Sequence, residues 1–266
     1  MHIMEKGGDE MRKTIDGIET DYIDCGDGAF VFLLHGWGSK KELFAPVTEL
    51  LSAKYRAIAP DLPGFGETQE PSEDWDLSSY VDFVIRFIES FEAKRVILLG
   101  HSFGGRIIIK MASRTSLPFV IDRIILTGSA GILPKRSAGY YIRTKLYKLG
   151  KSFLNWAPVK KLFPGALPGL LKKMGSSDYA AASPVMRKVL VRVVNEDLAP
   201  LLPQIPEETL LIWGENDTAT PLSDGMQMER EIPNAGLAKI ARAGHYAWLD
   251  QPYVFASILK SYLKIN

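Results

Sequence analysis

The stretch Arg95-Val96-Ile97-Leu98-Leu99-Gly100-His101-Ser102-Phe103-Gly104-Gly105-Arg106 decides the fold of this chain. Residues 96–99 are typical of a short buried strand, and residues 107–112 are typical of an apolar helix. A strand that turns into a helix within one or two residues brings backbone segments close together, so the positions two residues from the apex need very small side chains. Glycine occupies both of these positions around Ser102, and the sequence therefore predicts that Ser102 stands at the apex of a strained turn.

The same turn suggests a chemical role for Ser102. The hydroxyl would be lifted clear of the sheet at the N-terminus of a helix, where the helix dipole favours developing negative charge. Glycine-x-Ser102-x-glycine is the pattern of a nucleophile elbow, but taken alone it is equally typical of an ordinary glycine-rich turn between a strand and a helix. The rest of the chain has to decide between the two interpretations.

The composition is that of an ordinary globular protein. The 266 residues are 46% apolar and 24% charged with a formal net charge of +1, which fits one α/β domain with an insertion, or two small domains, and does not point to nucleic acid. The single cysteine, Cys25, excludes an intramolecular disulfide and a cysteine-rich metal site. No run of about 18 apolar residues occurs, and the N-terminus lacks the apolar core of a signal peptide. We therefore expect a cytoplasmic protein without a transmembrane segment and with a loose tail over residues 1–10.

Buried strands alternate with amphipathic helices along most of the chain. Strands are predicted within 12–24 and at 29–34, 55–59, 96–99, 121–126, 209–213 and 236–241, and helices at 77–91, 107–112 and 252–262. Asp76 is placed to cap the first of these helices. The alternation predicts a mostly parallel sheet with helices on both faces, in which the chemistry gathers at the carboxyl ends of the strands.

Residues 131–200 interrupt this alternation. They contain six prolines and are strongly basic, with 13 lysines and arginines against three acidic residues. Helical segments are predicted near 139–156 and 184–197. The segment is typical of an inserted helical cap, so the α/β core is assigned to residues 11–130 and 201–266.

A serine hydroxyl needs a base to take its proton, and the chain has four histidines. His2 lies in the predicted tail. The turn sends the side chains of His101 and Ser102 in different directions, so we expect His101 to have a packing role. His35 precedes a glycine-rich loop, which we expect it to order. His245 follows the last predicted strand, at the same edge of the sheet as Ser102, and is the predicted base.

The base in turn needs an acceptor that fixes its tautomer. Asp217 follows the penultimate strand and is the predicted acid, while Glu215, nearer the strand end, is the alternative. The strand that ends near residue 127 offers no carboxylate. The predicted catalytic residues are therefore Ser102, Asp217 and His245, in the chain order expected for this architecture.

Attack on a carbonyl also requires donors for the oxyanion. The backbone N–H of Phe103, just after the nucleophile, is one candidate. The second is the N–H of Trp37, because the flanking glycines let this loop approach closely. A simple tight turn is the other interpretation of this loop.

Several of these motifs together resemble the α/β-hydrolase superfamily over nearly the full length of the chain. They are His35-Gly36-Trp37, Asp61-x-Pro63-Gly64-x-Gly66, Gly100-His101-Ser102-Phe103-Gly104-Gly105, Gly214-x-x-Asp217-x-x-x-Pro221 and Gly244-His245. The resemblance implies the α/β-hydrolase fold: an eight-stranded, mostly parallel sheet with the second strand antiparallel and a helical cap after the sixth strand. It also implies hydrolysis through an acyl-enzyme without metal or organic cofactor, and a structural role for Asp61.

The resemblance narrows the chemistry as well. A serine at the apex favours acyl transfer, and the chain is similar both to carboxylesterases and to C–C bond hydrolases of the meta-cleavage-product type. The latter usually carry a tryptophan directly after the base, whereas here Tyr246 follows His245 and Trp248 comes later. We expect hydrolysis of a small carboxylic ester or thioester. A C–C hydrolase, or a ligand receptor that retains the triad, remains the alternative.

The predicted cap supplies two further expectations. Its apolar side chains should line the substrate pocket, and the candidates are Leu146, Trp156, Phe163 and Met186. Residues 139–156 also interleave apolar and basic side chains. Such a helix could receive an acidic acyl-carrier protein or an anionic membrane surface, or could simply cover the pocket with a solvated basic face.

Overall fold

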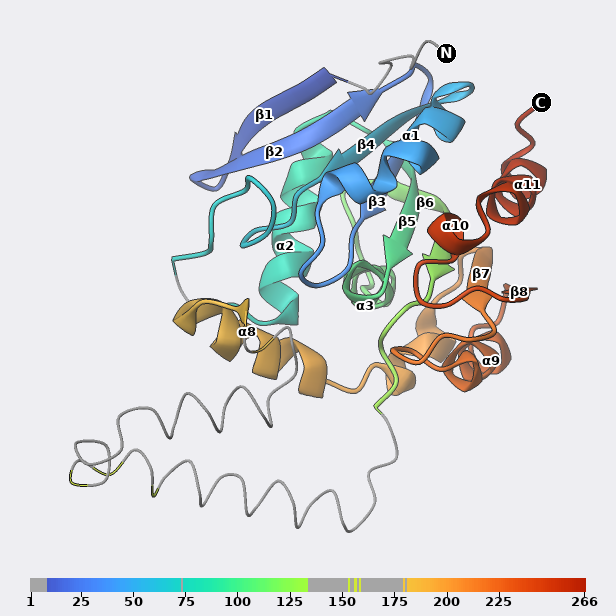
Figure 1. Cartoon of the computed structure of the whole chain (residues 1–266). Helices are drawn as coiled ribbons and strands as arrows, with labels where there is room; N and C mark the ends of the chain where they lie inside the picture. Colours follow the sequence, from blue (N-terminus) through green and yellow to red (C-terminus); the bar gives the residue numbers. More distant parts are fainter. Residues whose placement is uncertain are drawn as a thin grey trace, which may run out of the picture.

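The computed structural model describes residues 9–72, 74–133 and 181–266, together with Phe153, Trp156, Pro158 and Tyr179. In this part of the chain, one eight-stranded sheet has the order β1-β2-β4-β3-β5-β6-β7-β8 (Figure 1). The strands are β1 (Asp9–Ile15), β2 (Ile18–Cys25), β3 (Ala29–Leu34), β4 (Tyr55–Pro60), β5 (Arg95–His101), β6 (Val120–Thr127), β7 (Thr209–Gly214) and β8 (Ala235–Ile240). Strand β2 is antiparallel to β1 and β4, and every other neighbouring pair is parallel. The predicted eight-stranded, mostly parallel sheet is confirmed.

Helices cover both faces of this sheet. They are η1 (Lys41–Phe44), α1 (Ala45–Ser52), α2 (Leu77–Glu89), α3 (Phe103–Ala112), α8 (Pro184–Asn195), η2 (Ala199–Gln204), α9 (Leu222–Glu231), α10 (Ala247–Asp250) and α11 (Pro252–Leu263). Side chains alternate between the faces along β3. Phe32 and Leu34 pack in a cluster with residues of α2, α3 and α8, whereas Val31 and Leu33 pack with residues of α1, α10 and α11.

Helix α2 begins with the cap at Asp76 that the sequence predicts. The Asp76 carboxylate accepts a hydrogen bond from the backbone N–H of Ser79 at 2.9 Å, and the Ser79 hydroxyl accepts one from the N–H of Asp76. This reciprocal capping satisfies N–H groups that a helix start leaves without partners. The helix then buries Tyr80, Phe83 and Phe87 against the sheet.

Strand β1 begins earlier than the hydrophobic pattern suggests. Asp9 pairs with Asp24, and Glu10 pairs with Ile23, so the last two residues of the predicted tail belong to the sheet. Polar residues enter the strand here because backbone pairing with β2 extends beyond the apolar positions. A turn at Asp16 and Gly17 joins β1 to β2, with a φ of 51° at Asp16.

Helix α8 lies in the segment predicted as a cap and coincides with the helical segment predicted near 184–197. It crosses the end of the sheet where β5 leads into α3 (Figure 1). The other predicted cap helix, over 139–156, falls outside the described residues except for Phe153 and Trp156. Among the helices of the described ranges, none has both the length and the apolar character of a membrane span.

Candidate active site

Ser102 lies at the junction of β5 and α3, in the strained turn predicted for it. Its φ is 50° and its ψ is −107°, a combination that side-chain-bearing residues rarely adopt. The flanking glycines leave no room for side chains. A Cβ on Gly104 would lie 2.0 Å from the Leu34 carbonyl oxygen, and one on Gly100 would lie 2.7 Å from the backbone nitrogen of Gly105. The glycines are therefore needed for the close contact between α3 and the sheet.

Asp217 and His245 meet in the loops that follow β7 and β8. Oδ2 of Asp217 lies 2.8 Å from Nδ1 of His245, with the aspartate side chain fully buried and the histidine side chain 18% exposed. Burial alone would raise the pKa of Asp217, but the hydrogen bonds from His245 and Thr220 hold it below its ordinary value. An ionised Asp217 keeps the proton of His245 on Nδ1 and leaves Nε2 as the basic nitrogen. Glu215, the alternative acid, is exposed.

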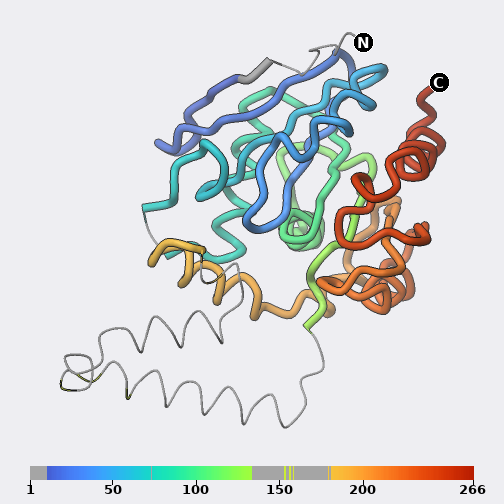
Figure 2. Tube along the Cα trace, viewed as in Figure 1, coloured from blue at the N-terminus to red at the C-terminus, as the bar shows by residue number. Residues whose placement is uncertain are grey.

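Segments that are far apart in the sequence line one cavity of about 320 Å³. Ser102 and His245 both line it, as do Trp37 and Phe103 from the two predicted oxyanion loops. The Cα trace in Figure 2 shows why, because the green β5–α3 segment runs between the blue β3 segment and the orange-to-red C-terminal segment. The remaining lining residues are Gly36, His101, Arg106, Ala130, Leu190, Val194, Ala219, Thr220 and Tyr246.

The loop that carries Trp37 packs directly against the turn that carries Ser102. A Cβ on Gly36 would lie 3.2 Å from the Ser102 Cβ and 2.9 Å from Nδ1 of His101, so glycine permits this close approach. The carbonyl oxygen of His35 accepts a hydrogen bond from the backbone N–H of Gly104 at 3.1 Å. The Trp37 ring contacts the Phe103 ring edge-on, with centroids 5.4 Å apart.

The four predicted substrate-binding residues do not share one location in the structure. Leu146 and Phe163 lie outside the described residues. Trp156 is 62% exposed and is not among the described residues that line the Ser102 cavity. Met186 is 2% exposed and lines a neighbouring cavity of about 310 Å³ together with Trp37, which the two cavities share.

Thr220 is a site residue that the sequence reasoning missed. Its Oγ1 lies 2.8 Å from Oδ2 of Asp217 and 3.3 Å from Nδ1 of His245. Its backbone N–H donates to Oδ1 of Asp217 at 2.9 Å, and the N–H of Ala219 does the same at 2.9 Å. A carboxylate followed three residues later by a threonine is a sequence signal for such a turn.

His101 packs against His245, the predicted base, in the packing role expected for His101. The His101 and His245 ring centroids are 4.5 Å apart, and Nε2 of His101 donates to the carbonyl oxygen of His245 at 3.0 Å. Complete burial, assisted by the nearby His245, lowers the pKa of His101 to about 3. His101 is therefore neutral at physiological pH.

The low pKa of His101 predicts a loss of stability in acid. An unfolded His101 takes up a proton below its ordinary pKa of 6.5, whereas the folded one stays neutral down to about pH 3. The contribution of His101 to the free energy of unfolding is thus fully present above pH 6.5. It decreases by up to about 1.4 kcal/mol for each unit by which the pH is lowered between 6.5 and about 3. We expect His101→Gln, measured by urea unfolding at pH 7.0, 5.5 and 4.5, to lose about 2 kcal/mol less than wild type between the extremes. Parallel losses in the two proteins would contradict this assignment.

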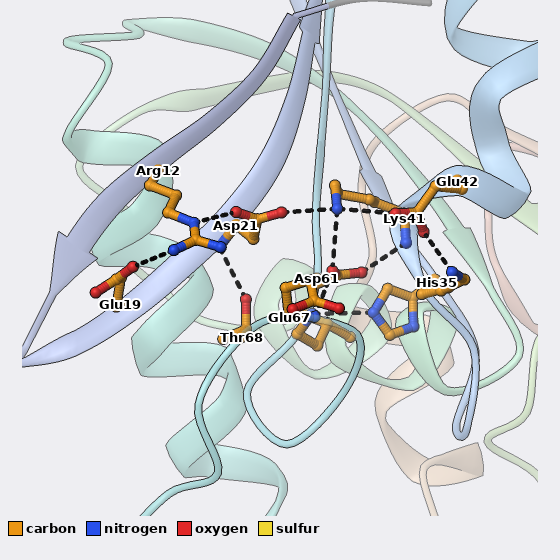
Figure 3. A network of polar contacts seen from close by, with 11 residues as sticks. Arg12, Glu19, Asp21, His35, Lys41, Glu42, Asp61, Glu67 and Thr68 are labelled. Carbon is orange, nitrogen blue, oxygen red and sulfur yellow. Dashed lines mark hydrogen bonds and ion pairs between the residues drawn. The ribbon is translucent and has the colours of Figure 1, made fainter.

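A buried polar network fixes the loop after β3 (Figure 3). The ammonium of Lys41, which is 1% exposed, lies 2.7 Å from Oδ2 of Asp21 and 3.4 Å from Oδ2 of Asp61. Asp61 also accepts from the backbone N–H groups of Lys41, at 2.7 Å, and Glu67, at 3.0 Å. His35 accepts at Nε2 from the N–H of Leu62, at 2.9 Å. Asp61 and His35 therefore hold turns, as expected for them.

In this network, the positive charge of Lys41 and the negative charges around it stabilise one another. Burial would lower the pKa of Lys41, but its hydrogen bonds to Asp21 and Glu42 raise it above the ordinary value. Burial would raise the pKa of Asp21, but Lys41 and Arg12 lower it. Lys41 and Asp21 are therefore both ionised at neutral pH, and the Lys41 ammonium lies between the side chains of Asp21 on β2 and Asp61 in the loop after β4.

Comparisons with known proteins agree with this architecture. The model of the alpha/beta hydrolase family matches residues 31–258. The 2-hydroxy-6-oxo-2,4-heptadienoate hydrolase of Pseudomonas putida is 28% identical over 263 residues, which cover 93% of each chain. The solved meta-cleavage product hydrolase of Pseudomonas fluorescens is 26% identical with a TM-score of 0.71, covering 96% of this chain and 97% of that one. An esterase of Exiguobacterium antarcticum, 24% identical with a TM-score of 0.74 and coverage of 97% and 99%, has the same fold. The chain belongs to the alpha/beta hydrolase family and is a hydrolase.

Proposed function

We propose that this protein is a serine hydrolase that cleaves carboxylic esters or thioesters of small acyl groups through an acyl-enzyme. Ser102 is the nucleophile, His245 the base and Asp217 the acid. One observation carries the proposal: the Asp217–His245 hydrogen bond of 2.8 Å at the cavity that Ser102 lines. This arrangement supplies a nucleophile, a base and an orienting carboxylate from three separate loops.

The reaction follows from these positions. Nε2 of His245 takes the hydroxyl proton while Oγ of Ser102 bonds to the substrate carbonyl carbon, and the backbone N–H groups of Trp37 and Phe103 hold the oxyanion. The C–O or C–S bond then breaks, and the leaving group takes the proton from His245. Water, deprotonated by His245, attacks the acyl-enzyme and releases the acid and Ser102. Asp217 stays ionised and stabilises the imidazolium throughout.

A C–C bond hydrolase is the second candidate, because relatives named as a 2-hydroxy-6-oxo-2,4-heptadienoate hydrolase and as a meta-cleavage product hydrolase match over nearly the full chain. The surroundings of the base favour the ester reaction. Tyr246, and not a tryptophan, follows His245 and lines the cavity. Trp248 is buried and donates from Nε1 to the Leu43 carbonyl oxygen at 2.9 Å.

Labelling combined with turnover tests the proposal. We expect a fluorophosphonate to modify Ser102 rapidly, and short acyl esters and thioesters of graded chain length to be hydrolysed over many cycles. Labelling without appreciable turnover would instead indicate a receptor that retains the triad. Cleavage of a 2-hydroxy-6-oxo-dienoate but of none of the esters would favour the C–C hydrolase.

Two expectations about the protein's surroundings stay predictions. One is the cytoplasmic location. The other is docking of an acidic acyl-carrier protein or an anionic surface on the basic helix expected over 139–156, which lies outside the described residues except for Phe153 and Trp156.

A further inference from the structure

Arg106 is a buried cation that the ester mechanism does not use. It lies on α3, one helical turn beyond Ser102, and it lines the same cavity. The residue is 4% exposed. An arginine with a packing role alone would be expected to have a carboxylate partner at this depth, because burying an unpaired charge is unfavourable.

Among the described residues, the guanidinium of Arg106 forms no ion pair with a carboxylate. Its Nη2 donates to the backbone carbonyl oxygen of Glu196, and its Nε is buried without any hydrogen-bond partner. The carboxylate of Glu196 pairs with Lys110 instead, at 2.5 Å. Burial lowers the pKa of Arg106, whereas the charges of Glu196 and Asp197 raise it, and the resulting pKa of about 10 keeps the side chain charged at neutral pH.

The long segment outside the description, between the loop after β6 and α8, is poor in acidic residues. Between residues 134 and 180 the sequence has a single acidic residue, Asp178, and ten lysines and arginines. Leu190 and Val194 of α8, both apolar, also line the cavity. An anion entering this cavity would therefore meet a desolvated guanidinium that has no ion-pair partner among the described residues, which is a favourable setting for a charge-assisted hydrogen bond.

We propose that Arg106 binds a carboxylate carried by the acyl part of the substrate, so that the natural substrate is the monoester or monothioester of a short dicarboxylic acid. Residues one turn apart on a helix are neighbours, with Cβ atoms about 5–6 Å apart, so the second carboxylate lies about two to four carbons from the carbonyl that Ser102 attacks. The inference rests on the proposed function, and it adds the substrate class. Arg106 acts in binding, and no bond is made or broken at it.

The test compares two esters of equal length, monoethyl glutarate and ethyl pentanoate, which differ only in a terminal carboxylate or methyl group. We expect wild type to hydrolyse monoethyl glutarate with a kcat/KM about 100-fold higher, because only this ester satisfies the buried guanidinium. Arg106→Gln should bring the ratio of the two kcat/KM values close to one, mainly by raising KM for the charged ester. Arg106→Lys keeps the charge but not the planar fork, and should restore part of the preference.

Two further variants separate binding from a structural role. Lys110→Arg keeps a cation next to Glu196 on the same helix, so the Glu196 carboxylate stays paired, and it should leave the substrate ratio unchanged. Asp178→Asn should also leave it unchanged. If Arg106→Gln lowers both kcat/KM values in parallel and keeps their ratio, Arg106 has a structural role only and the inference is overturned. The inference is also overturned if Asp178→Asn shifts the ratio as Arg106→Gln does, because Arg106 then pairs with a carboxylate of the protein.

A measurement without turnover keeps the inference separate from the proposed function. Calorimetric titration of Ser102→Ala with monoethyl glutarate should show saturable binding that is lost when Arg106→Gln is added. Equal binding in the two variants would overturn the inference. Wild-type hydrolysis of ethyl pentanoate without preference for the charged ester would overturn this inference alone. Arg106-dependent binding without hydrolysis of any ester would instead overturn the proposed function.

Discussion

Ser102→Ala is expected to reduce kcat for an aryl ester such as 4-nitrophenyl acetate by about 10⁴- to 10⁶-fold, the range seen when the nucleophile of such a triad is removed. The loss is large because the reaction has no other route to the acyl-enzyme. Without Oγ, His245 can only activate water, and water is not held by the strained turn that presents the serine. The measurement is steady-state release of 4-nitrophenol, with the uncatalysed rate subtracted.

A second serine beside the turn provides the matched control. Ser129 is buried, and a Cβ on Gly105 would lie 2.0 Å from its hydroxyl oxygen. Its hydroxyl donates to the carbonyl oxygen of Ala130 at 3.0 Å. Ser129→Ala should leave kcat within about threefold of wild type, because the proposed reaction does not use this hydroxyl. A large loss in Ser129→Ala together with a small one in Ser102→Ala would reassign the nucleophile.

Asp217→Asn is expected to lower kcat by about 10³- to 10⁴-fold. The hydrogen bonds around the carboxylate give the reason. Oδ1 accepts from the backbone N–H groups of Ala219 and Thr220, so the oxygen of an asparagine must occupy that position. Its NH₂ group then faces Nδ1 of His245. The imidazole has to accept there and carry its proton on Nε2, where it cannot take the serine proton.

The pH dependence and a neighbouring carboxylate test this explanation. The deficit of Asp217→Asn should shrink with a substrate that bears a good leaving group as pH rises, because hydroxide partly replaces the lost base. Glu215→Gln is the control, since Glu215 is exposed and two residues away, and its kcat should stay within about twofold of wild type. A Glu215→Gln deficit as large as that of Asp217→Asn would move the acid to Glu215.

Most of the fold follows from local patterns in the sequence. The glycines around Ser102 predict the turn because only a residue without a side chain fits there, and most of the restriction comes from the backbone of the turn itself. Asp76 predicts the start of α2 for a similar reason, since its carboxylate caps N–H groups within the next turn. The parallel sheet follows from apolar runs such as β3, which is buried on both faces.

Features that depend on distant partners are less accessible to sequence reasoning. The pairing of Asp9 and Glu10 with β2 arises from backbone hydrogen bonds that leave no hydrophobic pattern. Arg106 looks like one basic residue in an apolar helix, and only the three-dimensional structure shows that it lies in the cavity and that its neighbour Lys110 takes the Glu196 carboxylate. Thr220 reaches His245 only because two loops meet at the edge of the sheet.

The ion network at Lys41 has a consequence for where the catalytic unit begins. The family match starts at residue 31, but one of the carboxylates that enclose Lys41 comes from Asp21, on β2. A shortened protein cut at the family boundary would leave the ammonium facing Asp61 and Glu42 alone, at the base of the loop that carries Trp37. The first hairpin therefore helps to hold the loops around the proposed active site, and any shortened version of this protein has to keep it.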